Sequence, residues 1–338
     1  MKRLLFFIPI LLFTVSSCRD DIVVKNTPEN VFLAFWNTMN DRYVYFEEKK
    51  INWDSIYTIY YPKAVAAKDE NELFSIMSEI VVQFKDSHLY LAKSSTEGAG
   101  YLSDSTSYYY LVPIMYYYGF MPYAKYYDQY FTTYQYATKN YAYVSYSSFA
   151  FKQDISFVIS TLDSLNLRDG LILDIRNNGG GYLDNALELA SLFYAGEHTV
   201  LYKTPKMSPK RNDFSNPIPV KYTGRNIVPS TVPIILLTEA RTYSAGNLFA
   251  YIMKDLPNCI TVGERTGGGG SPIMSEYLPN GWVLNYPYIK NFSSKGVNME
   301  NGLEPNVHVN YVLYKDTIID IQLKKAISIL DSINSRRR

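Results

Sequence analysis

Between residues 141 and 263, apolar β-like runs alternate with amphipathic runs of helical period, and this alternation limits the fold more than any other feature. The β-like runs are YAYVSYSSF, GLILDIRNN, VPIILLTE and CITVGE. The helical runs lie around residues 153–166, 183–194 and 245–256. Strands that alternate with helices build layered α/β folds in which the helices cover a central sheet. We therefore predict an α/β core with a central, buried sheet.

The chain on either side of this core has helical periodicity as well. Apolar residues recur at helical spacing over 28–84, and a strand should begin just after His88. The stretch 94–139 is dense in tyrosine and favours short strands and loops, whereas the last 25 or so residues should close the fold as a helix. We divide the chain after its first 27 residues into an N-terminal helical region (28–92), a tyrosine-rich connecting segment (93–140) and the core (141–338).

The first 18 residues, MKRLLFFIPILLFTVSSC, have the layout of an export signal. Two basic residues precede an apolar stretch that is too short to span a bilayer, and VSSC resembles the site at which bacterial lipoproteins are cleaved and lipidated. We predict a signal peptide over 1–17, a lipidated Cys18, a tether over 18–27, and a location in the bacterial cell envelope, periplasmic or on the outer surface. An ordinary signal peptide with an incidental cysteine is the alternative.

Charge and cysteine content exclude several classes of function. Loss of Lys2 and Arg3 with the signal would change the formal net charge from +1 to −1, which predicts no attraction to nucleic acid. Cys259 is the only cysteine besides Cys18, so an exported form would have no disulfide framework. Cys259 lies in the strand-like run NCITVGE and is expected to be a small core residue.

The segment RTYSAGN places Ser244 between an apolar strand and an amphipathic helix. One interpretation is an ordinary helix N-cap, in which the serine oxygen accepts a backbone N–H. The other is a nucleophile, because a hydroxyl on such a turn is accessible and the helix N-terminus favours a nearby oxyanion. The serine alone does not decide between them.

A second strand-to-helix turn, LDIRNNGGG, ends in three glycines. Neither a P-loop nor a well-formed dinucleotide motif is present, which argues against nucleotide binding. A plain glycine turn is one interpretation. An oxyanion hole made by Gly180 or Gly181 together with the N–H of Ala245 is the other, if Ser244 is a nucleophile.

A nucleophilic serine needs a base, and the sequence contains three histidines. His308 alternates with valines and should be an exposed strand residue, while His198 falls in a polar run that we expect to be a loop. His88 lies at a helix-to-strand junction, from which its side chain could project into a cleft. An ordinary hydrogen-bonded histidine remains the alternative for His88.

Five segments taken in order resemble the tail-specific (C-terminal processing) peptidases and the related tricorn core. They are DSH at 86–88, ILDIRNNGGG at 172–181, TEARTYSAGN at 238–247, VGERTGGG at 262–269 and NGLEPNVHV at 301–309. The resemblance implies an α/β (α+β) fold in which a helical N-terminal region precedes a ClpP/crotonase-like β-α core with a central sheet. It also implies Ser244 as the nucleophile, with the amides of Ala245 and of Gly180 or Gly181 as oxyanion donors.

The resemblance is closer to the tricorn-like branch than to the processing-peptidase branch. The latter uses a lysine that follows the serine, but the corresponding stretch here is TGGGGS and contains no lysine. In the tricorn-like pattern His88 is the general base, and Ser87 and a glutamate orient it. Glu300 and Glu304 both fit by position, and we prefer Glu300 because Glu304 stands beside Pro305.

The resemblance implies a serine endopeptidase that acts on peptides or unfolded proteins without a cofactor or metal, and the signal-like N-terminus adds a lipid anchor at Cys18. Many relatives carry a peptide-binding PDZ module, but the segment 93–140 is too short for one, so the module is expected to be reduced or absent. Two other functions fit the same fold, a non-catalytic peptide- or glycan-binding lipoprotein and an esterase.

Overall fold

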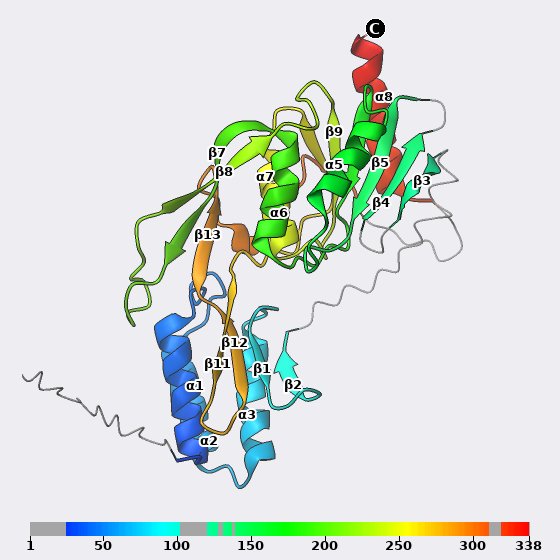
Figure 1. The fold of residues 1–338 in the computed structure, drawn as a ribbon. Helices are drawn as coiled ribbons and strands as arrows, with labels where there is room; N and C mark the ends of the chain where they lie inside the picture. The colour runs from blue at the N-terminus through cyan, green and yellow to red at the C-terminus, as the bar shows by residue number, and fades with distance from the viewer. Residues whose placement is uncertain (1–24, 102–119, 128–130, 137–138, 311–318, 338) are drawn as a thin grey trace, which may run out of the picture.

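The computed structural model describes residues 25–101, 120–127, 131–136, 139–310 and 319–337. Over these ranges the chain forms an α/β core and a smaller N-terminal unit, which lie at opposite ends of the molecule in Figure 1. None of the helices in these ranges is long and apolar enough to cross a membrane. The predicted signal peptide and Cys18 lie outside the described residues.

A seven-stranded mixed sheet with the order β14-β10-β9-β6-β5-β4-β3 forms the centre of the core. The two antiparallel strands are β4 (Phe131–Tyr136) and β3 (Phe120–Tyr127), and β3 forms that edge of the sheet. The parallel strands are β5 (Tyr141–Tyr146), β6 (Gly170–Asp174), β9 (Ile234–Thr238), β10 (Cys259–Gly263) and β14 (Val307–His308). The four β-like runs of the sequence are thus β5, β6, β9 and β10, and the predicted central sheet is confirmed.

Helices bury both faces of this sheet. Residues of one face, such as Leu173 and Leu236, pack in a cluster with three helices, and Ile172 and Ile235 on the other face pack against a fourth. This arrangement explains why the central strands are continuously apolar rather than alternating. The helices are α5 (Ile155–Ser164), α6 (Leu183–Ala190) and α7 (Ala245–Lys254) on the first face and α8 (Ile321–Arg337) on the second.

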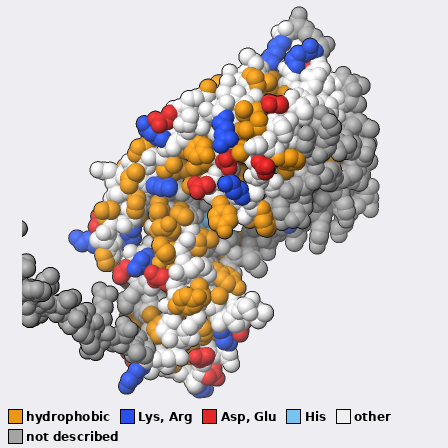
Figure 2. Space-filling model, viewed as in Figure 1, with side chains coloured by type: hydrophobic (Ala, Val, Ile, Leu, Met, Phe, Trp, Pro, Cys, Tyr) orange, Lys and Arg blue, Asp and Glu red, His pale blue; other side chains and the backbone are white. Residues whose placement is uncertain are grey.

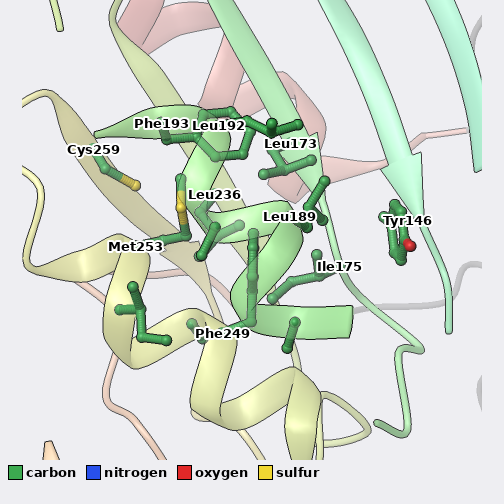
Figure 3. Close-up of a cluster of buried hydrophobic side chains, with 14 of the residues drawn as sticks. Tyr146, Leu173, Ile175, Leu189, Leu192, Phe193, Leu236, Phe249, Met253 and Cys259 are labelled. Atoms are coloured by element: carbon green, nitrogen blue, oxygen red, sulfur yellow. The ribbon is translucent and has the colours of Figure 1, made fainter. Parts of the chain in front are cut away.

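Figure 3 shows the larger of the two core clusters at the packing of α7 onto the sheet. Phe249 and Met253 of α7 point toward Leu236 of β9, and Cys259 lies beside them. Cys259 is buried and free, as the sequence predicts. The sheet and α8 are also joined by a buried ion-pair network, in which Arg176 donates to Asp174 and Asp320 at 2.6 and 3.0 Å.

The helical region predicted over residues 28–84 is confirmed, but it contains three helices where the apolar stripes of the sequence mark two. Each begins after a side chain that accepts a backbone N–H of its first turn: Thr27, Asn52 and Asp69. Aromatic side chains hold the helices together, and Trp36 stacks on Trp53 with ring centroids 4.1 Å apart. The helices are α1 (Pro28–Arg42), α2 (Trp53–Val65) and α3 (Glu70–Gln83).

A four-stranded antiparallel sheet with the order β11-β12-β1-β2 completes the N-terminal unit. Two of its strands directly follow α3 in the chain, and the other two come from the C-terminal half. Leu284 and Tyr286 of the C-terminal strands are buried in the same cluster as Phe35 and Trp53 of the helices. The strands are β1 (Tyr90–Ala92), β2 (Gly98–Gly100), β11 (Ile273–Tyr277) and β12 (Val283–Pro287).

A third sheet, of order β13-β7-β8, lies between the two units in Figure 1. Its strands are β7 (Ala195–Pro205), β8 (Ile218–Arg225) and β13 (Ile289–Ser293). The expectation that His198 lies in a loop is wrong, because His198 is part of β7 and pairs with Tyr222 of β8. The exposed start of this strand is polar, so its sequence resembles that of a loop. His308 is an exposed residue of β14, as predicted.

The described surface carries no extended field of one charge on the face shown in Figure 2. Acidic and basic side chains are interspersed there, and the hydrophobic side chains lie in several separate groups. This mixture agrees with the near-zero net charge of the chain.

Candidate active site

Ser244 occupies the sharp turn between β9 and α7. Its backbone has φ 53° and ψ −122°, a conformation that residues other than glycine rarely adopt. Two hydrogen bonds hold this turn: the Ser244 N–H donates to Gly268 O at 2.9 Å, and Ser244 O accepts from Leu248 N at 3.0 Å. Such strain costs about 1–3 kcal/mol and is concentrated at functional sites.

The Ser244 hydroxyl does not cap α7, so the interpretation of this residue as an ordinary N-cap is wrong. Within the described part of the chain the hydroxyl has no hydrogen-bond partner, and the side chain is partly exposed. The Gly246 N–H donates to Tyr243 O at 2.9 Å, so of the first two N–H groups of α7 the Ala245 N–H is the one that remains available beside this hydroxyl.

The glycine turn after β6 packs directly against Ser244. Gly180 has φ 97°, and a Cβ atom there would lie 2.7 Å from Ser244 Cβ and 2.8 Å from Ala245 N. Because β6 and β9 are neighbouring parallel strands, the turns at their carboxyl ends meet at one edge of the sheet. Only glycine allows this close approach.

Asn178 fixes the relative position of the two turns. This buried side chain accepts the Gly180 N–H at 2.9 Å, and the Asn178 carbonyl accepts the Tyr243 N–H at 3.0 Å. The amide of Gly180 is therefore occupied. By contrast, the amides of Gly181 and Ala245 donate to no other atom of the described residues.

His88 lies in the connection between α3 and β1, 5% exposed. Its backbone N–H donates to Asp86 Oδ1 at 2.9 Å, and Tyr43 donates to the other oxygen of Asp86 at 2.8 Å. The imidazole contacts the ring of Tyr243 edge-on, with centroids 4.8 Å apart, and its Nδ1 is buried without a partner. A histidine of the N-terminal unit thus lies against the residue that precedes Ser244, without a hydrogen bond to the Ser244 hydroxyl.

The surroundings of His88 favour a neutral imidazole. Burial lowers the pKa of His88, the Asp86 carboxylate partly offsets this effect, and the Lys49 ammonium lowers the pKa further. A neutral imidazole at pH 7 is the form that can accept a proton.

The two candidate glutamates have different surroundings. Glu300 is 3% exposed; its Oε1 lies 2.8 Å from Lys49 Nζ, and its Oε2 accepts the Gly270 N–H at 2.9 Å. Burial and the Asp86 charge raise the pKa of Glu300 to about 7, although Lys49 counteracts them. The side chain of Glu304 is 62% exposed and pairs with Arg265 at 3.2 Å.

A cleft of about 470 Å³ opens beside these groups. Ser87 and Glu300 contribute to its wall, and so does Tyr243, the neighbour of the serine. Its charged lining consists of Glu300 and three cations, Lys49, Lys85 and Arg241. Of the sequence-predicted catalytic residues, Ser87 and Glu300 line the cleft and Glu304 does not. Ser244 and His88 adjoin it through Tyr243, which precedes Ser244 and contacts the His88 ring.

The first three lysines that follow Ser244 in sequence have partners elsewhere. Lys254 donates to the Glu304 carbonyl, Lys290 pairs with Glu48, and Lys295 pairs with Asp255, each at 2.6 Å. None of them lines the cleft. The described residues also contain no cluster of three or more His, Cys, Asp or Glu side chains that could hold a metal ion.

The sequence analysis did not identify Lys49 and Tyr243 as site residues. Tyr243 stands next to the serine in TYSAGN, which is a local signal for its importance. Lys49 belongs to the charged stretch FEEKK and has no sequence feature that distinguishes it from an exposed lysine.

Two protein-family models match parts of the chain. The model of peptidase family S41 matches residues 140–309, half of the chain, and the model of the tricorn protease C1 domain matches residues 25–81. The crystal structure of a candidate peptidase from Parabacteroides merdae superimposes with a TM-score of 0.81 at 28% identity, covering 90% of this chain and 97% of that one.

Two curated relatives match over shorter stretches. A tricorn protease from Thermoplasma volcanium is 29% identical over 167 residues, 48% of this chain and 15% of the relative. A carboxyl-terminal-processing protease from Synechocystis is 29% identical over 102 residues, 30% of this chain and 22% of the relative. The chain therefore spans less than a third of the length of these relatives. The family match, the order of the motifs and the arrangement of the two turns lead to one conclusion: this chain belongs to peptidase family S41.

Proposed function

We propose that this chain is an exported, lipid-anchored serine endopeptidase that hydrolyses peptide bonds through an acyl-enzyme on Ser244. The observation that carries the proposal is the strained turn of Ser244, which holds a free hydroxyl at the start of α7 and against the glycine turn of Gly180. Strain of this kind persists only where surrounding contacts enforce it. The relatives named tricorn protease and carboxyl-terminal-processing protease support the same activity.

In the first chemical step His88 takes the hydroxyl proton of Ser244 while the serine oxygen bonds to the substrate carbonyl carbon. The electron pair of the carbonyl moves to its oxygen. Because Nδ1 of His88 is buried, Nε2 is the nitrogen assigned to this proton transfer. The ring must approach the serine when substrate binds, since catalytic hydrogen bonds often tighten only in the complex.

The amides of Gly181 and Ala245 are assigned to the oxyanion of the tetrahedral intermediate. Both are free to donate, whereas the Gly180 amide already donates to Asn178. Donors fixed before the reaction stabilise the developing charge without reorganisation, and removal of one such donor costs about 3–4 kcal/mol elsewhere.

Collapse of the intermediate breaks the C–N bond, and the proton held by His88 passes to the leaving amine. Water then attacks the acyl-enzyme, His88 accepts its proton, and the Ser244 hydroxyl is restored. The Asp86 carboxylate raises the pKa of His88 against the effect of burial, so it stabilises the imidazolium that forms twice in each cycle.

Export and anchoring complete the proposal. The supporting features are the signal-like sequence of residues 1–17 and Cys18 after VSS. A single acyl chain gives marginal membrane binding, whereas the multiple chains of a lipoprotein anchor give stable attachment. We place the enzyme in the bacterial cell envelope, where peptides or unfolded proteins are its substrates.

Labelling with a fluorophosphonate probe tests the proposal. The parent and Ser160→Ala, which removes an exposed hydroxyl of α5, should be labelled and should cleave casein, while Ser244→Ala should do neither. Labelling of Ser244→Ala at the parent rate would exclude Ser244 as the nucleophile. Labelling of the parent with hydrolysis of a p-nitrophenyl ester but not of casein would identify an esterase instead.

A further inference from the structure

We propose that Lys49 is a positioning residue of this active site, whose ammonium holds the Glu300 carboxylate and joins the unit that carries His88 to the core that carries Ser244. The inference rests on the proposed peptidase function. It also assigns Glu300 a partner that the sequence does not suggest.

The contact is a buried ion pair. Lys49 Nζ lies 2.8 Å from Glu300 Oε1, and the two side chains are 16% and 1% exposed. The other carboxylate oxygen accepts the Gly270 N–H at 2.9 Å, so both oxygens of Glu300 are engaged. A buried charge is tolerated only when it is paired and hydrogen-bonded, and Lys49 supplies the pairing.

On the core side, Glu300 is connected to the nucleophile through backbone hydrogen bonds. Glu300 O accepts the Gly269 N–H at 3.2 Å, and the preceding residue, Gly268, accepts the Ser244 N–H at 2.9 Å. Displacement of Glu300 would therefore also displace Gly268, which accepts the hydrogen bond of the Ser244 N–H.

On the other side, Lys49 is connected to the base. Its N–H donates to Tyr45 O at 2.9 Å, in the turn that follows α1. Tyr43, two residues earlier, donates to Asp86, and Asp86 accepts the His88 N–H. The Lys49–Glu300 pair thus closes a ring of contacts that runs from Ser244 to His88 across the two units.

The charges around the Lys49–Glu300 pair determine the protonation state of Lys49. Asp86 and Glu48 are the other carboxylates near Lys49, and the Glu48 side chain is itself paired with Lys290. Burial would lower the pKa of Lys49, but the charges of Glu300 and Asp86 outweigh it and raise this pKa, which keeps the ammonium charged. A charged, paired lysine is not a general base, which separates this role from a Ser-Lys dyad.

Loss of the Lys49 ammonium raises the pKa values of two neighbouring side chains. Lys49 lowers the pKa of Glu300 and the pKa of His88, so both values rise when it is removed. An opposite charge at this distance shifts a carboxyl pKa by roughly 1–3 units. The acid limb of the pH profile of kcat/KM should therefore move to higher pH.

The test compares Lys49→Met, Lys49→Arg and Lys290→Met with the parent, using a fluorogenic peptide between pH 5 and 9. Lys49→Met should shift the acid limb to higher pH, and Lys49→Arg, which keeps a cation, should recover most of the shift. Lys290→Met removes a second buried ion pair that does not contact Glu300, and it should leave the limb in place. An unchanged limb in Lys49→Met, or an equal shift in Lys290→Met or Lys49→Arg, would overturn the proposal.

A second measurement does not depend on activity. Melting temperatures of Lys49→Met and of the double variant Lys49→Met/Glu300→Gln should be similar at pH 5, where Glu300 is protonated in the fold. A carboxyl whose folded pKa is raised destabilises the fold increasingly as pH rises from its unfolded value through its folded value. The single variant should therefore melt progressively below the double variant toward pH 9. If the parent hydrolyses no peptide but this gap widens with pH by more than the gap between the parent and Glu300→Gln, the proposed function fails while the pairing stands. An equal or smaller widening overturns the pairing.

Discussion

Replacement of Gly180 by alanine tests the contact between the glycine turn and Ser244. The new methyl group would meet three atoms of the serine turn at 2.7–2.8 Å, namely Ser244 Cβ, Ala245 N and Tyr243 O. It would also force alanine into a φ of 97°. The turn of Ser244 is held by the sheet behind it, so the two turns must separate.

The expected magnitudes follow from these distances. The backbone conformation costs about 1–3 kcal/mol and the steric overlap a further ~1–3 kcal/mol. Relief of the overlap to ordinary contact requires the Ser244 Cβ distance to increase from 2.7 to 3.4 Å. A misplacement of about 1 Å lowers a catalysed rate by roughly 10²-fold, so kcat/KM should fall by between about 10-fold and 10²-fold.

Gly196→Ala is the matched control, because Gly196 has φ 75° but open space where the Cβ atom would lie. It should lose stability through the backbone alone and keep the parent rate. Urea unfolding measures the loss of stability. The rate of fluorophosphonate labelling measures the reactivity of Ser244, under conditions where circular dichroism confirms folding. Equal labelling rates for Gly180→Ala and Gly196→Ala would refute the argument that this close approach positions the serine.

Three further outcomes are expected. His88→Ala should lower kcat/KM on a fluorogenic peptide by several orders of magnitude, up to about 10⁶-fold, as loss of a triad base does elsewhere, and a loss below ten-fold would contradict its role as the base. Arg176→Met should cost about 3–5 kcal/mol of unfolding free energy in urea, because it leaves Asp174 and Asp320 buried without their cation; an unchanged midpoint would speak against the network. Cys18→Ser should move the protein from the membrane to the soluble fraction with its activity intact, and continued membrane association would contradict lipidation.

The central part of the fold could be predicted from the sequence because burial there is complete. β6 and β9 are buried on both faces and therefore appear as unbroken apolar runs, which are recognisable locally. β8 and β11 alternate between exposed and partly exposed residues, and the sequence analysis did not identify them. Their pairing partners are what make them strands, and such pairing is not encoded in a local pattern.

The turns of the candidate site could be predicted from the sequence, but the contacts between distant residues could not. The residues that form its turns, Ser244 and Gly180, are marked by the strand-to-helix transitions around them. The Lys49–Glu300 pair depends on a contact between residues about 250 positions apart in the chain, and a lysine beside glutamates is usually a solvated surface charge. The occupied amide of Gly180 depends on the rotamer of Asn178, which only coordinates reveal.

The sheet of the N-terminal unit has a consequence for the order in which the protein folds during synthesis. β1 pairs with β12, so the hydrophobic cluster of α1, α2 and α3 is not closed until residues 283–287 have been made. At about 5–20 residues per second the ribosome needs roughly 10–40 s to go from β1 to β12. The unit that carries His88 therefore stays incompletely folded until β12, which is synthesised after Ser244, is available to pair with β1. His88 and Ser244 should become ordered together, so a truncated chain that ends before β12 should expose the aromatic side chains of α1 and α2 and be prone to aggregation.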